Sequence, residues 1–100
     1  MASARALTDH DQIRGWAEER GARPACVRGT GTDGDAGILR FDFPGFTGAE
    51  TLEEISWELW FEAFERNQLA LVVQDETASG SRSHFNQLID RERVESSNGA

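Results

Sequence analysis

The chain has 100 residues, the length of one small domain with a single hydrophobic core. This length excludes a (β/α)₈ barrel enzyme and a repeat array. Acidic residues outnumber basic residues by 18 to 10, which gives a net charge of −8 and argues against direct binding to nucleic acid or to an anionic membrane. Cys26 is the single cysteine, so the chain has neither an internal disulfide nor a multi-cysteine zinc site.

The two ends of the chain lack the apolar periodicity of packed elements. We expect residues 1–7 to form a flexible N-terminus and residues 92–100 a disordered tail, with residues 8–91 as one domain between them. The chain has no run of about 18 apolar residues, and its N-terminus lacks the apolar stretch of a signal peptide. A cytoplasmic location is therefore expected.

The first periodic segment predicts a helix over about residues 9–20. Its apolar residues recur at the spacing of one buried helical stripe: Ile13, Trp16 and Ala17. We expect the Thr8 hydroxyl to cap this helix by accepting a hydrogen bond from the backbone N–H of Asp11. Gly21 stands where a left-handed residue ends a helix.

Two short strands are expected next, at residues 25–28 and 38–43. The second alternates apolar and charged residues, which is typical of a strand with one wet face. The connection, residues 29–37, is rich in glycine and begins with the pattern G-x-G-x-x-G. Because this loop leads into a strand, no helix N-terminus is present to hold a phosphate. The segment is predicted to be the tip of a β-hairpin, with Cys26 half-buried in its first strand.

A second helix is predicted over residues 57–66, with Ser56 as its N-cap and residues 52–55 as an extended approach. Thr51 offers a rival start, one and a half turns earlier. Four aromatic residues recur at the spacing of one helical face: Trp57, Trp60, Phe61 and Phe64. Asn67 is placed to end the helix in the left-handed conformation.

Residues 69–73 form a continuous apolar run, which predicts a buried central strand. Residues 85–89 have apolar positions that fit one more helical turn. The element order is then α-β-β-α-β, a small single α+β domain in which two helices pack on a three-stranded sheet. The residues expected in its core are Phe41, Trp60, Phe61, Leu71 and Val73.

No set of residues commits the chain to a catalytic chemistry. His10, His84 and Cys26 are too few for a metal site. The serines near residue 80 lack the nucleophile elbow and the base of a hydrolase triad. We therefore expect no enzyme activity, no cofactor and no bound metal.

Three segments in the same order, residues 8–21, 37–45 and 52–57, resemble a family of short bacterial proteins often labelled 1,4-alpha-glucan branching enzyme. The resemblance covers roughly residues 8–91. Val73 stands where that family favours a tyrosine, so a role of that ring does not transfer. The resemblance supplies no catalytic residues, and a glucan-branching barrel needs about 250 residues. The label is therefore not expected to describe the activity of this chain.

Most of the net charge lies in residues 50–76, which have eight acidic residues and only Arg66 as a basic residue. Within this stretch, the helix spacing predicts one exposed anionic ridge at Glu58, Glu62 and Glu65, with Trp57 as an aromatic anchor beside it. We expect the ridge to bind another protein, a basic one. The protein itself is expected to be a monomer or a weak homodimer.

Two other functions remain open at this point. An acidic inhibitor could imitate the charge of nucleic acid and occupy the groove of a basic protein. A carbohydrate-related accessory module, as the family label suggests, could use Trp57 or Trp60 as a sugar platform.

Overall fold

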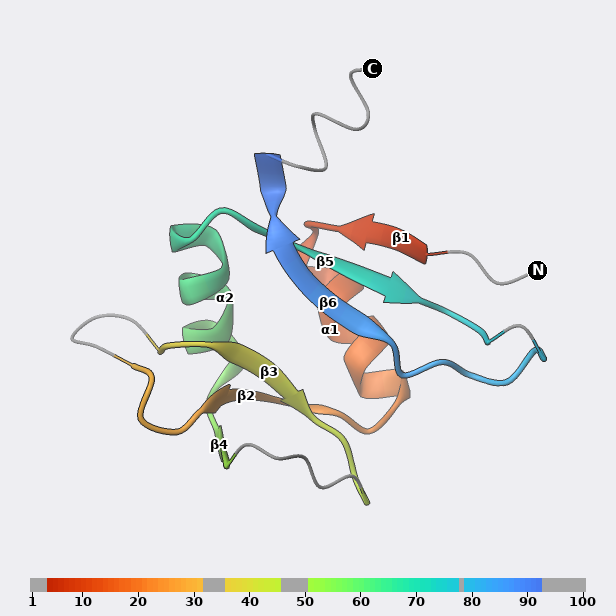
Figure 1. The fold of residues 1–100 in the computed structure, drawn as a ribbon, viewed down its shortest axis with the longest axis horizontal. Helices are drawn as coiled ribbons and strands as arrows, with labels where there is room; N and C mark the ends of the chain where they lie inside the picture. Colours follow the sequence, from red (N-terminus) through yellow and green to blue (C-terminus); the bar gives the residue numbers. More distant parts are fainter. Residues whose placement is uncertain (1–3, 32–35, 46–50, 78, 93–100) are drawn as a thin grey trace.

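The computed structural model describes residues 4–31, 36–45, 51–77 and 79–92 of the chain (Figure 1). In this part of the chain the elements are, in order, β1 (Ala4–Leu7), α1 (His10–Glu19), β2 (Arg23–Val27), β3 (Leu39–Asp42), β4 (Leu52–Glu54), α2 (Trp57–Arg66), β5 (Leu69–Gln74) and β6 (Asn86–Asp90). The α+β class predicted from the sequence is confirmed.

The strands form two antiparallel sheets, in the orders β1-β5-β6 and β3-β2-β4. The prediction of one three-stranded sheet is wrong, because β5 does not join the β2–β3 hairpin. Its neighbours come instead from both ends of the domain. Helix α2 packs against β2 and β3 of one sheet and against β5 of the other, so it connects the two sheets.

The flexible N-terminus expected for residues 1–7 is wrong for Ala4–Leu7, which form β1. This strand pairs with β5, with Leu7 opposite Leu71, and both side chains are buried. A strand of four residues is too short to show a period of its own. Its conformation is fixed by backbone hydrogen bonds to β5, which has an open edge on that side.

The helical turn expected at residues 85–89 is also wrong, because Asn86–Asp90 form strand β6. Leu88 lies opposite Leu71 and packs against the core, whereas Ile89 lies opposite Ala70 on the other face of the sheet. The apolar spacing in this segment fits a helix and a strand equally well. Pairing with the second edge of β5 decides in favour of the strand.

The N-cap of α2 agrees with the sequence prediction, whereas the N-cap of α1 and the left-handed residue after α2 differ from it. Asp9, not Thr8, caps α1, and its carboxylate accepts a hydrogen bond of 3.0 Å from the backbone N–H of Gln12. Ser56 caps α2 as predicted, which confirms the span 57–66. After α2 the left-handed residue is Gln68, with φ 51°, and not Asn67.

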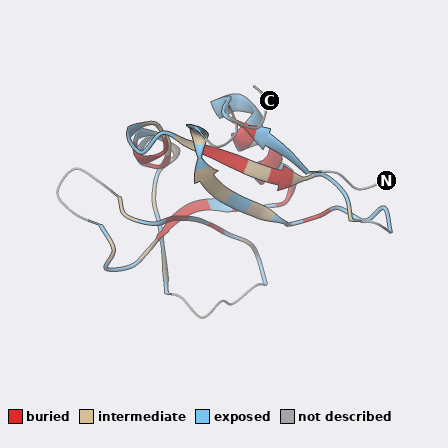
Figure 2. Cartoon of the chain, turned by 45° about the horizontal axis from the view of Figure 1, so that its top comes forward, coloured by how far each residue is buried: buried red, intermediate tan, exposed pale blue. Residues whose placement is uncertain are grey.

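The core lies between the two helices and the two sheets, and Figure 2 shows its buried residues along β2, β5 and the helices. Four of the five predicted core residues are buried: Phe41, Trp60, Leu71 and Val73. Phe61 is only half-buried, and its ring stacks on the surface residue His10 with 4.1 Å between the ring centroids. The second helix therefore buries a narrower face than its aromatic stripe suggests.

Candidate functional site

Helix α2 presents three different surfaces to its surroundings. Trp60 and Phe64 are fully buried in the core. On the side toward α1, Phe61 stacks on His10. On the side toward the β2–β3 hairpin, Leu59 is 49% exposed although it is a large apolar residue. The acidic residues of the helix are distributed among these surfaces, and their surroundings differ.

Glu65 belongs to the α1 side and is not a free charge. Arg91 donates two hydrogen bonds to its carboxylate, at 3.1 and 3.0 Å, and His10 Nε2 lies 2.8 Å from one of its oxygens. The hydrogen bonds from Arg91, and after them the one from His10, lower the pKa of Glu65. Of the predicted ridge at Glu58, Glu62 and Glu65, the structure shows that Glu65 is partly exposed but already paired.

The acidic stretch as a whole is largely neutralised in three dimensions. Arginines from outside residues 50–76 pair with three of its carboxylates, and Arg66 pairs with a fourth. The ion pairs are Arg5–Asp75, Arg23–Glu54, Arg91–Glu65 and Arg66–Glu62. Of the carboxylates in this stretch that the structure describes, Glu53, Glu58 and Glu76 make no ion pair.

The tryptophans are held within an aromatic cluster. Trp60 is buried, and its indole N–H donates a hydrogen bond of 3.1 Å to the carbonyl of Arg40. Trp57 is half-buried and stacks on Phe61 at 5.3 Å, with the Arg14 guanidinium 6.0 Å from its ring centroid. Neither indole offers the open ring face that a sugar platform needs.

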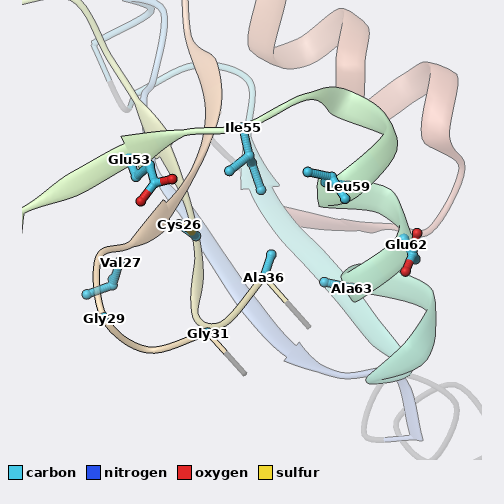
Figure 3. A pocket seen from close by; sticks show the side chains of 10 residues that line it. All are labelled: Cys26, Val27, Gly29, Gly31, Ala36, Glu53, Ile55, Leu59, Glu62 and Ala63. Carbon is cyan, nitrogen blue, oxygen red and sulfur yellow. The ribbon is translucent and has the colours of Figure 1, made fainter. Parts of the chain in front are cut away.

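A cavity of about 470 Å³ lies between α2, β4 and the base of the β2–β3 loop (Figure 3). We call it the α2 groove. Its apolar lining comes from β2, the β2–β3 loop, the connection between β4 and α2, and α2 itself, and includes Cys26, Ala36, Ile55, Leu59 and Ala63. Glu53 and Glu62 lie on opposite sides of the groove, and the side chains of Ile55 and Leu59 lie between them.

The local sequence explains this arrangement. Cys26 is opposite Glu53 in the β2–β4 ladder, so both side chains lie on the same face of the sheet. Leu59, Glu62 and Ala63 are three and four residues apart, so they share one face of α2. These two faces meet at the groove.

The described ends of the glycine-rich loop supply the remaining wall, through Gly29, Gly31 and Ala36. The Thr30 hydroxyl donates to the carbonyl of Val27 at 2.6 Å and accepts from the N–H of Ile38 at 3.0 Å, which closes the neck of the loop. Gly37 has φ 100°, and a Cβ there would overlap Thr30. Gly29 and Gly31 line the groove, and no helix begins at this loop in the part of the chain that the structure describes.

The groove is lined by one thiol, Cys26, and by two carboxylates, Glu53 and Glu62. Burial raises the pKa of the Cys26 thiol, and the charge of Glu53 raises it further, so the thiolate needed for nucleophilic attack is disfavoured. Within the described ranges, no three histidine, cysteine or acidic side chains converge to hold a metal ion. The lining of the groove therefore combines an apolar surface with two carboxylates, which can bind a ligand by apolar contact and by charge.

The sequence indicates α2 as the binding element but not the groove beside it. Leu59 is an apolar residue outside the aromatic stripe, and in the sequence it alone indicates a second apolar face on the helix. The sequence does not indicate that Glu53 lines the groove, because Glu53 comes to lie opposite Cys26 only through the pairing of β2 with β4.

Comparisons with protein-family models, with curated proteins and with solved structures found no match for this chain. None of the helices that the structure describes has the length and the apolar character needed to cross a membrane.

Proposed function

We propose that this protein is a non-catalytic protein-binding module whose binding surface is the α2 groove. Its partner is a protein segment with an aliphatic side chain flanked by basic residues. The observation that carries this proposal is the exposed Leu59 on an apolar floor with a carboxylate, Glu53 or Glu62, on either side.

The apolar floor supplies affinity. Covering the exposed half of the Leu59 side chain contributes about 1 kcal/mol, and an aliphatic residue of the ligand gains a similar amount by leaving water. An apolar site of this kind, surrounded by polar groups, is typical of a protein-binding surface. Cys26, Ile55 and Ala63 complete the surface on which such a side chain packs.

The carboxylates of Glu53 and Glu62 determine which partners bind. Glu53 has no ion pair among the described residues, and Glu62 has only the solvent-exposed Arg66. Basic residues on both sides of the aliphatic anchor place a positive charge near each carboxylate, whereas acidic residues are repelled. Since these charges are exposed, their contribution falls as salt is added.

Two observations favour this function over the alternatives. An inhibitor that imitates nucleic acid needs an array of unpaired anions, but four carboxylates of the acidic stretch are paired with arginines. A sugar platform needs an open tryptophan ring, but Trp60 is buried and Trp57 is half-buried.

Calorimetric titration with a synthetic peptide of about ten residues centred on Lys-Leu-Arg tests the proposal. We expect saturable binding that weakens severalfold between about 50 and 300 mM salt. Leu59→Asp should abolish the binding, whereas Ile38→Asp should not. Ile38 is a matched control, because it is an aliphatic residue of similar exposure, 46%, outside the α2 groove. Equal binding of a peptide centred on Glu-Leu-Glu would contradict the proposal.

A further inference from the structure

A second cavity, of about 580 Å³, lies between strand β3 of one sheet and strand β6 of the other. We call it the β3–β6 cleft. Leu39 lines it from β3, and Leu88 and Asp90 line it from β6. Ile38, an aliphatic residue that is 46% exposed, belongs to the same lining. The cleft shares no lining residue with the α2 groove, so it is a separate site.

The β6 wall of the cleft is an open sheet edge. In the order β1-β5-β6, strand β6 is last and pairs on one side only. The N–H of Arg91 donates to the carbonyl of Gln68, and hydrogen-bonded pairs alternate along an antiparallel ladder. The backbone N–H and carbonyl groups of Leu88 and Asp90 therefore face away from β5.

The β3 wall is an open edge as well. In the order β3-β2-β4, strand β3 pairs only with β2. The N–H of Val27 donates to the carbonyl of Ile38 at 2.8 Å, so the same alternation turns the N–H and carbonyl of Leu39 away from β2. The two edges line one cavity, yet no ladder joins β3 to β6 in the part of the chain that the structure describes.

We infer that the β3–β6 cleft binds an extended peptide segment of another protein, as a strand added between the two edges. An open edge is a template for pairing with a strand of another chain. In Figure 1, β3 and β6 run in opposite directions, so the added strand is antiparallel to one of them and parallel to the other. Both arrangements form backbone hydrogen bonds. A strand in this position pairs its own N–H and carbonyl groups on both sides.

The volume of the cleft fits this occupant. One residue of a strand takes up about 3.3 Å along the strand, about 4.8 Å between strands and about 10 Å through the sheet, or about 160 Å³. The 580 Å³ of the cleft therefore hold about three to four residues of a single strand.

The lining determines which side chains the peptide has. Leu88 and Asp90 are two residues apart and lie on the same side of β6, so an aliphatic residue beside Leu88 places its second neighbour beside Asp90. Asp90 is exposed and makes no ion pair with the described residues, which favours a basic residue there. On β3, Arg40 lies on the opposite side from Leu39, so the residue between the aliphatic and the basic one is polar and uncharged.

Amide hydrogen exchange of the full chain tests this inference, with a synthetic peptide of about nine residues centred on Lys-Thr-Val-Thr-Lys. The centre reads the same in both directions, so either direction of the added strand brings a lysine to Asp90. Saturating peptide should slow exchange at least severalfold at Leu88 and Asp90 on β6 and at Leu39 on β3. Gln87 is the internal control, because its N–H already faces β5 and should keep its exchange rate.

Two variants separate this site from the α2 groove. Asp90→Lys should weaken binding of the Lys-Thr-Val-Thr-Lys peptide at least severalfold, because it replaces an exposed carboxylate at the cleft by a like charge. Leu59→Asp should bind this peptide as the parent does, since Leu59 lines only the groove. The Lys-Leu-Arg peptide should lose its binding in Leu59→Asp, so failure of one proposal is distinguishable from failure of the other.

Four results would overturn the inference. Protection at Leu88 and Asp90 without protection at Leu39, or the reverse, would show that the peptide extends one sheet and is not inserted between two. No protection at about 1 mM peptide would exclude this class of ligand. Protection of both edges in the protein alone, as its concentration rises, would identify a second copy as the occupant. Binding by Asp90→Lys that equals binding by the parent would exclude the basic residue beside Asp90.

Discussion

Arg91 holds the carboxylate of Glu65 with both terminal nitrogens, at 3.1 and 3.0 Å. The same guanidinium donates a hydrogen bond to the carbonyl of Leu69 at 3.0 Å. The pair thus joins the residue after β6 to α2 and to the start of β5. It also pairs the charge of Glu65, so the carboxylates that line the α2 groove are Glu53 and Glu62.

Glu65→Gln should lower the free energy of unfolding by about 1 kcal/mol at neutral pH, since the Glu65 side chain is 42% exposed and solvent screens the pair. The pKa of Glu65 is lowered in the folded state, so this contribution is present above the ordinary value of 4.5 and is lost as the pH falls through the folded value. Denaturant unfolding at neutral pH and at about pH 3 measures it. The difference between parent and variant should shrink in acid. A Glu58→Gln control should match the parent at neutral pH, and an equal loss in that control would count against the Arg91 pair.

Phe64→Ala should lower the free energy of unfolding by about 3–5 kcal/mol, because Phe64 is fully buried between the two sheets. Phe61→Ala should cost about half as much, since the Phe61 ring is half-buried against His10. A domain of this size has only about 5–15 kcal/mol of stability, so thermal melting separates the two variants. Equal melting temperatures would show that the buried face of α2 is assigned wrongly.

Arg20→Lys should lower the free energy of unfolding by about 2–3 kcal/mol. The buried guanidinium donates to three backbone carbonyls, those of Trp16, Asp75 and Ser83, and one ammonium cannot reach all three. These bonds hold the turn after β5 against α1. Hydrogen exchange at the Ser83 amide, which donates to Asp75, should accelerate more than exchange at Leu71 in the middle of β5. Uniform acceleration at both amides would exclude a local role for Arg20.

The elements with strong local signals were predictable from the sequence. Helix α2 has a capping serine and a helical aromatic stripe, and both are properties of residues close together in the chain. The β2–β3 hairpin is likewise defined by alternation and by the glycine-rich connection. Such signals are local, so one sequence is enough to find them.

The two-sheet arrangement could not be predicted, because it depends on partners far apart in the chain. Ala4–Leu7 has no period of its own and becomes a strand by pairing with β5, which lies more than sixty residues away. The lining of the candidate site could not be predicted from the sequence for the same reason. Glu65 looks like a surface anion until Arg91 reaches it, and Glu53 joins the groove only through its pairing opposite Cys26.

The rate at which a thiol reagent modifies Cys26 tests the groove proposal most directly. Cys26 is the only thiol in the chain, and it lines the α2 groove. Its side chain is buried and burial raises its pKa, so the reaction is slow. Saturating amounts of the Lys-Leu-Arg peptide should slow the reaction at least severalfold in the parent protein and leave it unchanged in Leu59→Asp. The Glu-Leu-Glu peptide should give no protection. An unchanged rate in the parent at peptide concentrations up to about 1 mM would contradict a basic, aliphatic ligand in this groove.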